Sequence, residues 1–450
     1  MKLDEFIEKL FKSAEEYGFT GCEAYYGAGS SFRAMVRGGE VEEYKSAESG
    51  GLSFRGIYGG KMGYSYSEAI DGAIIPLLVK NAAENAGIIE SAEAERLFKG
   101  SESYMELPED TDGDEMDPAR KIELAKRMEA RALSADPRVK SVIHCLVSTG
   151  SGETRIMNTL GLSLSHASGY AYALILVQAE ENSQVKVAGE YYIGHSLKGF
   201  DPEDLAEQAV KKAVSYLGAS PVKNGKYPVV LNNLEAINLI SSFAGVFYAE
   251  KVQKGFSLLK GKLGTTIASE CVTLRDDGVY KDSLGNVPFD SEGVATKNKA
   301  VIENGVLKTY LYNLKTAEID GVESTGNGFK PSFRNPVGTA CANFYIVPSD
   351  TGLEELFKEM GDGLYITELA GLHSGTNAVS GSFSLSADGY LIENGKIARP
   401  VEQITVAGNF FDLLKDITAV GSDLRFDDPG GDGCFGMPSI LIKELAVAGV

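Results

Sequence analysis

"SSFRAMVRGGEVEEYKSAESGGLSFRGIYGGKMGYSYS", residues 30–67, carries the clearest structural pattern in the chain. Apolar and polar residues alternate along it, and glycine pairs interrupt the alternation at 38–39, 50–51 and 59–60. Such alternation buries one face of a strand, and paired glycines supply the positive φ angles that tight hairpin turns need. We therefore expect a meander of antiparallel hairpins that turns at each glycine pair.

The segments on both sides of this meander have helical patterns. Apolar residues at three- and four-residue steps predict an amphipathic helix over residues 3–17, which Gly18 ends. A second helix-like stretch covers residues 68–86. Residues 1–99 are therefore expected to form an N-terminal α+β unit.

An acidic stretch follows at residues 100–117 and is poor in aliphatic side chains. It reads as a linker, because such a segment buries too little apolar surface to offset the entropy lost on ordering. Asp117 followed by Pro118 then predicts the capped start of a helix. These features separate the first unit from a second.

The second α+β unit is expected over residues 118–218. Strand-like runs at 139–148 and 169–178 precede an amphipathic helix over 202–217. The stretch "GASPVKNGKYP", residues 218–228, is rich in glycine and proline and predicts a second linker.

The last portion, residues 225–450, is expected to be a β-rich domain. Residues 300–313 and 389–401 each place an Asn-Gly pair between two β-type runs, which is typical of a hairpin. The helices and strands do not alternate as βαβ units. The predicted fold class is therefore α+β, with mixed or antiparallel sheets.

Composition limits the class of function. The 450 residues carry a net charge of −20 without a basic cluster, which disfavours direct binding to nucleic acid. No apolar run approaches the roughly 18 residues that span a membrane, and the first residues lack the pattern of a secretory signal. Five scattered cysteines indicate free thiols rather than a disulfide framework. We expect a cytoplasmic protein.

The four histidines offer little for catalysis. His144 and Cys145 are neighbours on a predicted strand, so their side chains point to opposite faces and cannot form a local thiolate–imidazole pair. His166 and His195 stand beside predicted turns without a carboxylate or cysteine at ligand spacing, and we expect solvated loop histidines. His373 lies in a loop crowded with Gly, Ser, Thr and Asn, which can bring backbone groups to a ligand.

Acidic residues give a second set of candidates. Asp282, Asp290 and Glu292 lie close together in the sequence and could act as acid and base. Acidic residues in turns between strands are far more common, and we favour that structural reading.

Several long motifs resemble one known family. They are "SLGNVPFDSEGVATKNKAVIENGVLKTYLYNLKTAEIDGVESTGNG" at 283–328, "VSGSFSLSADGYLIENGKIARPVEQITVAGN" at 379–409 and "GSDLRF" at 421–426. With the stretch at 36–67, they resemble the TldD/PmbA family over nearly the whole chain, and in particular its PmbA (TldE) branch. This family also carries the label "modulator of DNA gyrase".

The resemblance implies where a zinc site would lie. TldD-like members carry H-E-x-x-x-H shortly before a glycine-rich run, which here is "KGFSLLKGKLG" at 254–264. Counting back from that run places Ile240 and Gly245 at the two histidines and Ser241 at the glutamate. The resemblance therefore implies a helix that is kept without its zinc chemistry, and neither a metal nor a catalytic residue is assigned to this chain. Cys434 is not assigned as a ligand.

The resemblance also implies a role. PmbA-like chains pair with a zinc-bearing TldD-like partner in a cytosolic protease that cuts unfolded peptides or peptide-antibiotic precursors. We therefore expect a non-catalytic subunit, with zinc only in the partner; the alternatives are a metal-independent hydrolase and a regulatory or binding homodimer. The expected border of the shared peptide chamber comprises Ser324, Thr325, Asn327, His373, Asn377 and Ser380.

Overall fold

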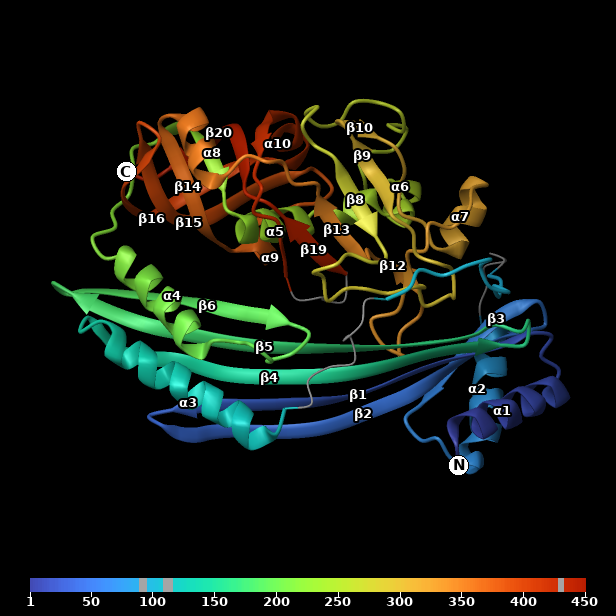
Figure 1. Ribbon diagram of the computed structural model, residues 1–450. Helices are drawn as coiled ribbons and strands as arrows, with labels where there is room; N and C mark the ends of the chain where they lie inside the picture. The colour runs from blue at the N-terminus through green and yellow to red at the C-terminus, as the bar shows by residue number, and fades with distance from the viewer. Residues whose placement is uncertain (89–94, 108–115, 428–432) are drawn as a thin grey trace.

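The computed structural model describes residues 1–88, 95–107, 116–427 and 433–450. One long sheet runs beneath a C-terminal portion that contains two further large sheets (Figure 1). The fold is α+β, as predicted. None of the helices in these described ranges is long and apolar enough to cross a membrane.

The long sheet contains six antiparallel strands in the order β3-β2-β1-β4-β5-β6. Their bounds are β1 Cys22–Arg37, β2 Glu40–Tyr58, β3 Lys61–Ser67, β4 Val139–Asn158, β5 Ser163–Glu181 and β6 Gln184–Gly194. Strands from residues 1–99 and from residues 118–218 therefore share one sheet. The boundary drawn between those regions in the sequence does not separate two sheets.

Two of the three turns predicted for the meander are confirmed. Gly38–Gly39 joins β1 to β2 and Gly59–Gly60 joins β2 to β3, all four with φ between 58° and 79°. The turn predicted at Gly50–Gly51 is wrong, because both residues lie inside β2 and pair with Ala28 and Gly27. A Cβ added to Gly51 would lie 2.4 Å from the ring of Phe333. Glycine is needed there for close packing rather than for a turn.

Helices pack on both ends of the long sheet. Near β2 and β3 lie α1 Leu3–Tyr17, η1 Gly72–Ile74 and α2 Ile75–Ile88; near β4 and β6 lie α3 Pro118–Ala135 and α4 Pro202–Ser215. The helix over 3–17 and its Gly18 stop are confirmed, as is the Asp117 cap of α3, whose side chain accepts from Ala119 N. The stretch predicted from residue 68 becomes helical only at Gly72, in a 3₁₀ turn.

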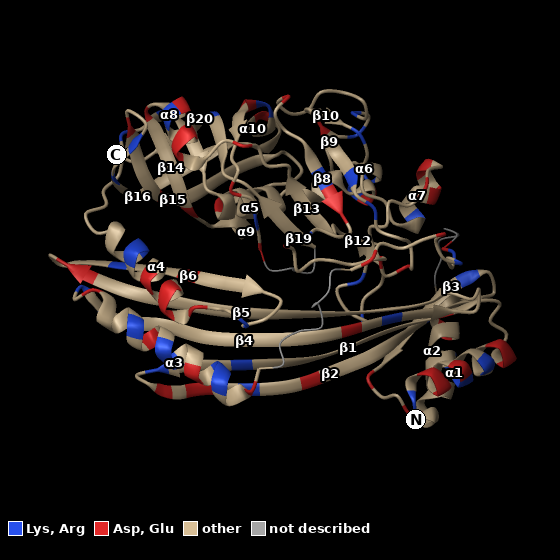
Figure 2. Ribbon diagram, in the orientation of Figure 1, with Lys and Arg blue, Asp and Glu red and all other residues tan. Residues whose placement is uncertain are grey.

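Helices α3 and α4 are joined by charge. Figure 2 shows basic residues along α3 beside acidic residues of α4. Arg127 donates two hydrogen bonds of 2.8 Å to Glu203, and Arg131 lies 2.5 Å from Glu207. These pairs are partly exposed, so each stabilises the fold by only about 1 kcal/mol or less. Their main effect is to set the register of the two helices.

The expected linkers are attached to the fold. Ser101 Oγ accepts from Ala295 N at 3.0 Å, and Tyr104 OH donates to Gly293 O at 3.0 Å. The part of the 100–117 stretch at 108–115 lies outside the described residues. The second linker, at 218–228, already enters β7 at Gly225.

The C-terminal portion contains two six-stranded mixed sheets and a two-stranded ribbon. The strand orders are β16-β15-β14-β7-β20-β17, β10-β9-β8-β13-β19-β18 and β11-β12. Strands β14 and β7 are parallel, as are β13 and β19, and the other pairings are antiparallel. This confirms the expected mixed and antiparallel sheets.

The bounds of these strands are as follows: β7 Gly225–Leu231, β8 Leu274–Asp277, β9 Lys299–Glu303, β10 Val306–Leu307, β11 Gly328–Phe329, β12 Gly338–Thr339, β13 Asn343–Ile346, β14 Gly363–Ala370, β15 Ser382–Glu393, β16 Lys396–Asn409, β17 Ile417–Val420, β18 Arg425–Phe426, β19 Cys434–Met437 and β20 Ile440–Ala448. Both predicted Asn-Gly hairpins are confirmed. Asn304–Gly305 joins β9 to β10 and Asn394–Gly395 joins β15 to β16, all with positive φ.

The helices of this portion complete its core. Their bounds are α5 Asn233–Ser241, η2 Ala244–Phe247, α6 Ala249–Gln253, α7 Leu314–Asp320, α8 Leu353–Met360, α9 Leu372–Gly375 and α10 Phe410–Asp416. Helix α5 contacts β14 of one sheet and β19 of the other. Its apolar side chains therefore help to close the core between the two sheets.

Candidate functional site

The segment at the implied zinc-motif position begins as a helix. Asn232 caps α5 by accepting from Glu235 N at 2.7 Å, and Ile240 is 1% exposed inside the core. The α-helix ends at Ser241, and Gly245 lies in the separate 3₁₀ turn η2. Residues 240–245 are therefore not one continuous helix.

The side chains of this segment do not fit a zinc ion. Ile240 is a hydrocarbon, Gly245 has no side chain, and the Ser241 hydroxyl donates to Asn238 O at 3.2 Å. Zinc in proteins takes Cys, His, Asp or Glu ligands. In the described ranges, no three such residues are grouped closely enough to hold a metal. We therefore derive no chemical step through a metal in this chain.

The histidine and cysteine predictions have different outcomes. His144 is exposed while Cys145 is fully buried, which confirms their opposite faces. Cys145 donates to Ala125 O at 3.1 Å, and burial raises the pKa of its thiol to about 12, so it is no nucleophile near neutral pH. Cys434 is buried on β19, with its Sγ 3.2 Å from Ser283 Oγ.

The expectation for His166 is wrong, because this residue lies within β5 rather than in a loop. Its ring is half-buried against the Phe289 ring, 5.4 Å away, and burial lowers the pKa of the imidazole. Desolvation favours the neutral form of a histidine. His195 follows the end of β6, and within the described part of the chain its buried Nδ1 has no hydrogen-bond partner.

The three acidic candidates do not form one site. Asp290 and Glu292 are buried, at 1% and 4% exposure, whereas Asp282 is exposed. Asp290 accepts from the backbone N–H groups of Glu292, Val294 and Gly328 at 2.8–3.0 Å. These bonds hold the local backbone in a turn, so the role of Asp290 is structural. Burial raises the pKa of both Asp290 and Glu292.

The residues expected at a peptide chamber fall into two environments. Asn327 is fully buried, and Ser324 and Thr325 bond to the backbone of Tyr312. His373, Asn377 and Ser380 are exposed around α9 and the turn before β15. A common chamber for the two stretches stays a prediction.

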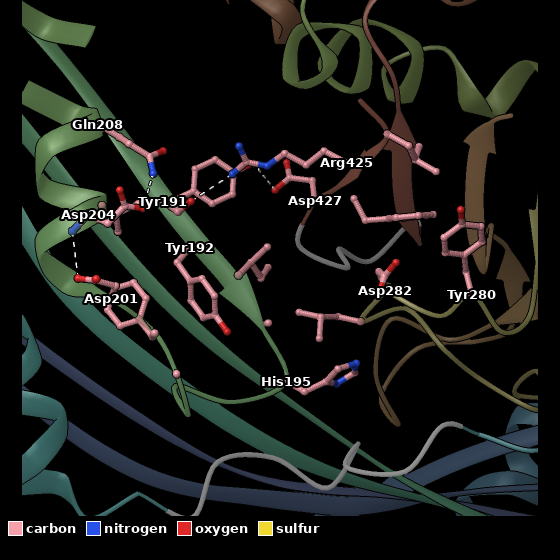
Figure 3. Close-up of a pocket in the computed structure, with 18 of the residues that line it drawn as sticks. Tyr191, Tyr192, His195, Asp201, Asp204, Gln208, Tyr280, Asp282, Arg425 and Asp427 are labelled. Carbon is pink, nitrogen blue, oxygen red and sulfur yellow. Dashed lines mark hydrogen bonds between the residues drawn. The ribbon is translucent and has the colours of Figure 1, made fainter. Parts of the chain in front are cut away.

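A cleft of about 750 Å³ opens where the long sheet meets the C-terminal portion (Figure 3). One wall comes from the end of β6 and the start of α4, and the other from residues 280–284 and 422–427. The labelled side chains in Figure 3 are Tyr191, Tyr192, His195, Asp201, Asp204, Gln208, Tyr280, Asp282, Arg425 and Asp427. The lining therefore combines aromatic rings with acidic groups.

Arg425 ties the two walls together. Its guanidinium lies 4.4 Å from the centre of the Tyr191 ring, and its Nη2 donates to Tyr191 O at 3.1 Å. Tyr191 OH in turn donates to Asp427 Oδ1 at 2.9 Å, and burial raises the pKa of this phenol. Such a cation–π contact contributes about 0.5–2 kcal/mol and fixes the position of the ring.

Sequence reasoning did not find this cleft. Tyr191 and Tyr192 belong to a strand, Asp201 and Asp204 to the first turn of a helix, and Arg425 to a segment more than 200 residues away. The only sequence signal is the motif "GSDLRF", which contains Arg425 but does not identify its neighbours.

Comparison with known proteins supports one family for the whole chain. Three family models of the PmbA/TldA metallopeptidases match this chain. The model of domain 1 matches residues 22–86, that of the central domain residues 111–217, and that of the C-terminal domain residues 224–449. A metalloprotease PmbA of Escherichia coli O157:H7 is 30% identical over 336 residues, which are 74% of this chain and 71% of that protein.

Solved structures agree along the full length. A candidate modulator of a DNA gyrase from Thermotoga maritima MSB8 has a TM-score of 0.90 at 33% identity, covering 99% of this chain and 100% of that one. TldE from Thermococcus kodakarensis has a TM-score of 0.89 with the same coverage, but at 23% identity it supports the fold alone. The domain matches and the E. coli relative together show that this chain belongs to the PmbA/TldD metallopeptidase family.

Proposed function

We propose that this chain is the non-catalytic, TldE-like subunit of a cytoplasmic zinc metallopeptidase that acts on unfolded peptides. The observation that carries the proposal is the segment from Ile240 to Gly245. At the implied zinc-motif position it has a buried isoleucine, a serine bonded to its own helix, and a glycine in a different helical element. The zinc and the water-activating glutamate would then belong to a TldD-like partner.

The family relatives support the choice of reaction. The E. coli relative is named a metalloprotease, and one structural neighbour is named TldE. The cysteines support a reducing compartment, because all five are scattered singly in the sequence and four of them are buried. In this proposal the chain contributes the walls of a shared peptide chamber and no metal ligand.

Co-expression with a TldD-like chain that carries H-E-x-x-x-H tests the proposal. We expect a complex with about one zinc per pair, and cleavage of an unfolded peptide that a chelator abolishes. The chain alone should hold no stoichiometric zinc after dialysis and should not cleave the peptide. Cleavage by the chain alone that survives chelation would favour a metal-independent hydrolase, and a homodimer that ignores the TldD-like chain would favour a regulatory role.

A further inference from the structure

The charged side chains that line the cleft in Figure 3 are mainly acidic. Four aspartates line it, Asp201, Asp204, Asp282 and Asp427, and Arg425 is the one lysine or arginine among its described lining residues. Its volume of about 750 Å³ lies in the range of sites that hold small molecules or short peptide segments. The cleft is therefore large enough for a ligand and has an excess of negative charge.

The cleft already holds one cation, which belongs to the chain itself. The Arg425 guanidinium lies on the face of Tyr191 and donates to the carbonyl of Tyr191, whose hydroxyl donates to Asp427. A ring face together with oxygen acceptors is the combination that recognises guanidinium and ammonium groups. Arg425 thus shows how this cleft can hold a cation.

A second tyrosine and aspartate, Tyr280 and Asp282, lie on the wall that also carries Arg425 and Asp427. Asp282 is exposed, and in the described part of the chain no hydrogen bond or ion pair engages its carboxylate. Figure 3 shows it between Tyr280 and His195, on the side of the cleft opposite β6. The ring of Tyr280 is held in place by Tyr345 at 4.8 Å and Phe426 at 4.9 Å between ring centres.

His195 adds a second polar group at this place. It lines the same cleft, and its buried Nδ1 has no hydrogen-bond partner among the residues that the structure describes. A buried polar group that makes no hydrogen bond has lost its contact with water without compensation. A ligand that reorients the ring or brings a bridging water would recover part of this loss.

From these contacts we propose that the cleft binds a lysine or arginine side chain of an extended peptide, with the cationic group at Asp282 beside the ring of Tyr280. The inference rests on the proposed function, and it adds a substrate class: unfolded segments with basic side chains. An acidic segment would be repelled by the four aspartates. The long-range field of a chain with net charge −20 acts in the same direction but is not specific to the cleft.

Direct binding to the purified chain tests this inference without any partner. The probe is a fluorescein-labelled peptide of alternating glycine and lysine, and its anisotropy gives the Kd. We expect Asp282→Asn to raise the Kd about fivefold, the size of one partly solvated charge contact. Glu8→Gln removes the same charge from the exposed face of α1, far from the cleft, and should leave the Kd unchanged.

Two further probes identify the ligand chemistry. The same peptide with acetylated lysines should bind at least fivefold more weakly, and 1,5-diaminopentane should compete poorly because it lacks a peptide backbone. Equal Kd values for Asp282→Asn and Glu8→Gln would overturn the assignment of the site to Asp282. Binding of the acetylated peptide as tightly as the unmodified peptide would overturn the requirement for a cationic side chain. Competition by the diamine at the same concentration as the peptide would overturn the peptide ligand.

The inference and the proposed function fail separately. If the reconstituted pair cleaves basic and neutral peptides equally, in wild type and in Asp282→Asn alike, the proposed function stands and the substrate class is overturned. If the isolated chain binds the basic peptide through Asp282 but no TldD-like partner yields cleavage, the cleft assignment stands and the proposed function is overturned.

Discussion

At the scale of single residues, Asn327 and Asn377 show that similar sequence surroundings can have opposite structural roles. Both lie among glycines and small polar residues. Asn327 is fully buried, and its Nδ2 donates to Asp276 Oδ2 at 2.8 Å and to Ala340 O at 2.9 Å. Asn377 is exposed, and its Oδ1 accepts from Val379 N and Ser380 N in a local turn. Burial cannot be inferred from such local composition.

The first prediction compares these two asparagines. Asn327→Leu should lower the free energy of unfolding by about 2–4 kcal/mol, because it removes two donors and leaves the buried Asp276 carboxylate short of a partner. Asn377→Leu should cost less than about 1 kcal/mol, since its lost bonds lie at the surface. The chain has no tryptophan, so urea unfolding followed by far-UV circular dichroism is the measurement. Equal midpoints for the two variants would contradict the prediction.

At the scale of elements, the sequence predicts structure best where the signal is local. The Asn-Gly turns, the Gly18 stop of α1 and the Asp117 cap of α3 depend only on neighbouring residues, and all are confirmed. The failure at Gly50–Gly51 has a distant cause, because the Phe333 ring that excludes a side chain there is almost 300 residues away. The cleft was missed for the same reason, since its two walls meet only in the tertiary fold.

Helix α5 shows an element that keeps its place without the implied chemistry. Its capping residue Asn232 and its buried residue Ile240 explain why the helix persists. Because the helix breaks after Ser241 and Gly245 lies in the separate turn η2, we expect that substitution alone would not restore a metal site. Two ligands five residues apart need a defined local distortion of the helix.

The second prediction follows from this geometry. The triple variant Ile240→His, Ser241→Glu, Gly245→His should show no chelator-sensitive peptide cleavage when supplied with zinc. It should also melt at a lower temperature, because a histidine replaces a side chain that is 1% exposed in the core. Ser241→Glu alone is the control, since Ser241 is only half-buried and this variant should stay folded. Robust cleavage that a chelator removes would contradict the prediction.

At the scale of the whole molecule, buried charges join the long sheet to the C-terminal portion. Arg55 of β2 donates to Glu23 of β1 at 2.6 Å and lies 3.8 Å from Glu292. Lys330 of the C-terminal portion donates to Ser53 Oγ of β2 at 3.0 Å. Burial lowers the pKa of its ammonium group to about 8. Such buried charges cost desolvation free energy, so they fix how the two parts fit more than they stabilise the fold.

The carboxylates of this junction should make stability depend on pH. Burial raises the pKa of Asp290 well above its ordinary value, and repulsion from Glu292 adds to the effect. Burial also raises the pKa of Glu292, which Arg55 partly opposes. In the unfolded chain both groups titrate near pH 4. Between that value and the raised pKa values the folded state binds more protons than the unfolded state, so the free energy of unfolding falls as pH rises.

The third prediction isolates this contribution from the repulsion among the many other acidic groups. Asp290→Asn should make the fall in stability above pH 4 shallower than in the wild type, because one of the two groups that retain a proton in the folded state is gone. The slope is the decisive quantity, since replacing an oxygen that accepts from Gly328 N also has a cost that does not vary with pH. Urea midpoints measured from pH 5 to pH 8 give that slope. Glu8→Gln removes an exposed carboxylate and should leave it unchanged. If Asp290→Asn and the wild type have parallel pH profiles, Asp290 is fully ionised in the folded state, and the junction tolerates two buried negative charges beside Arg55.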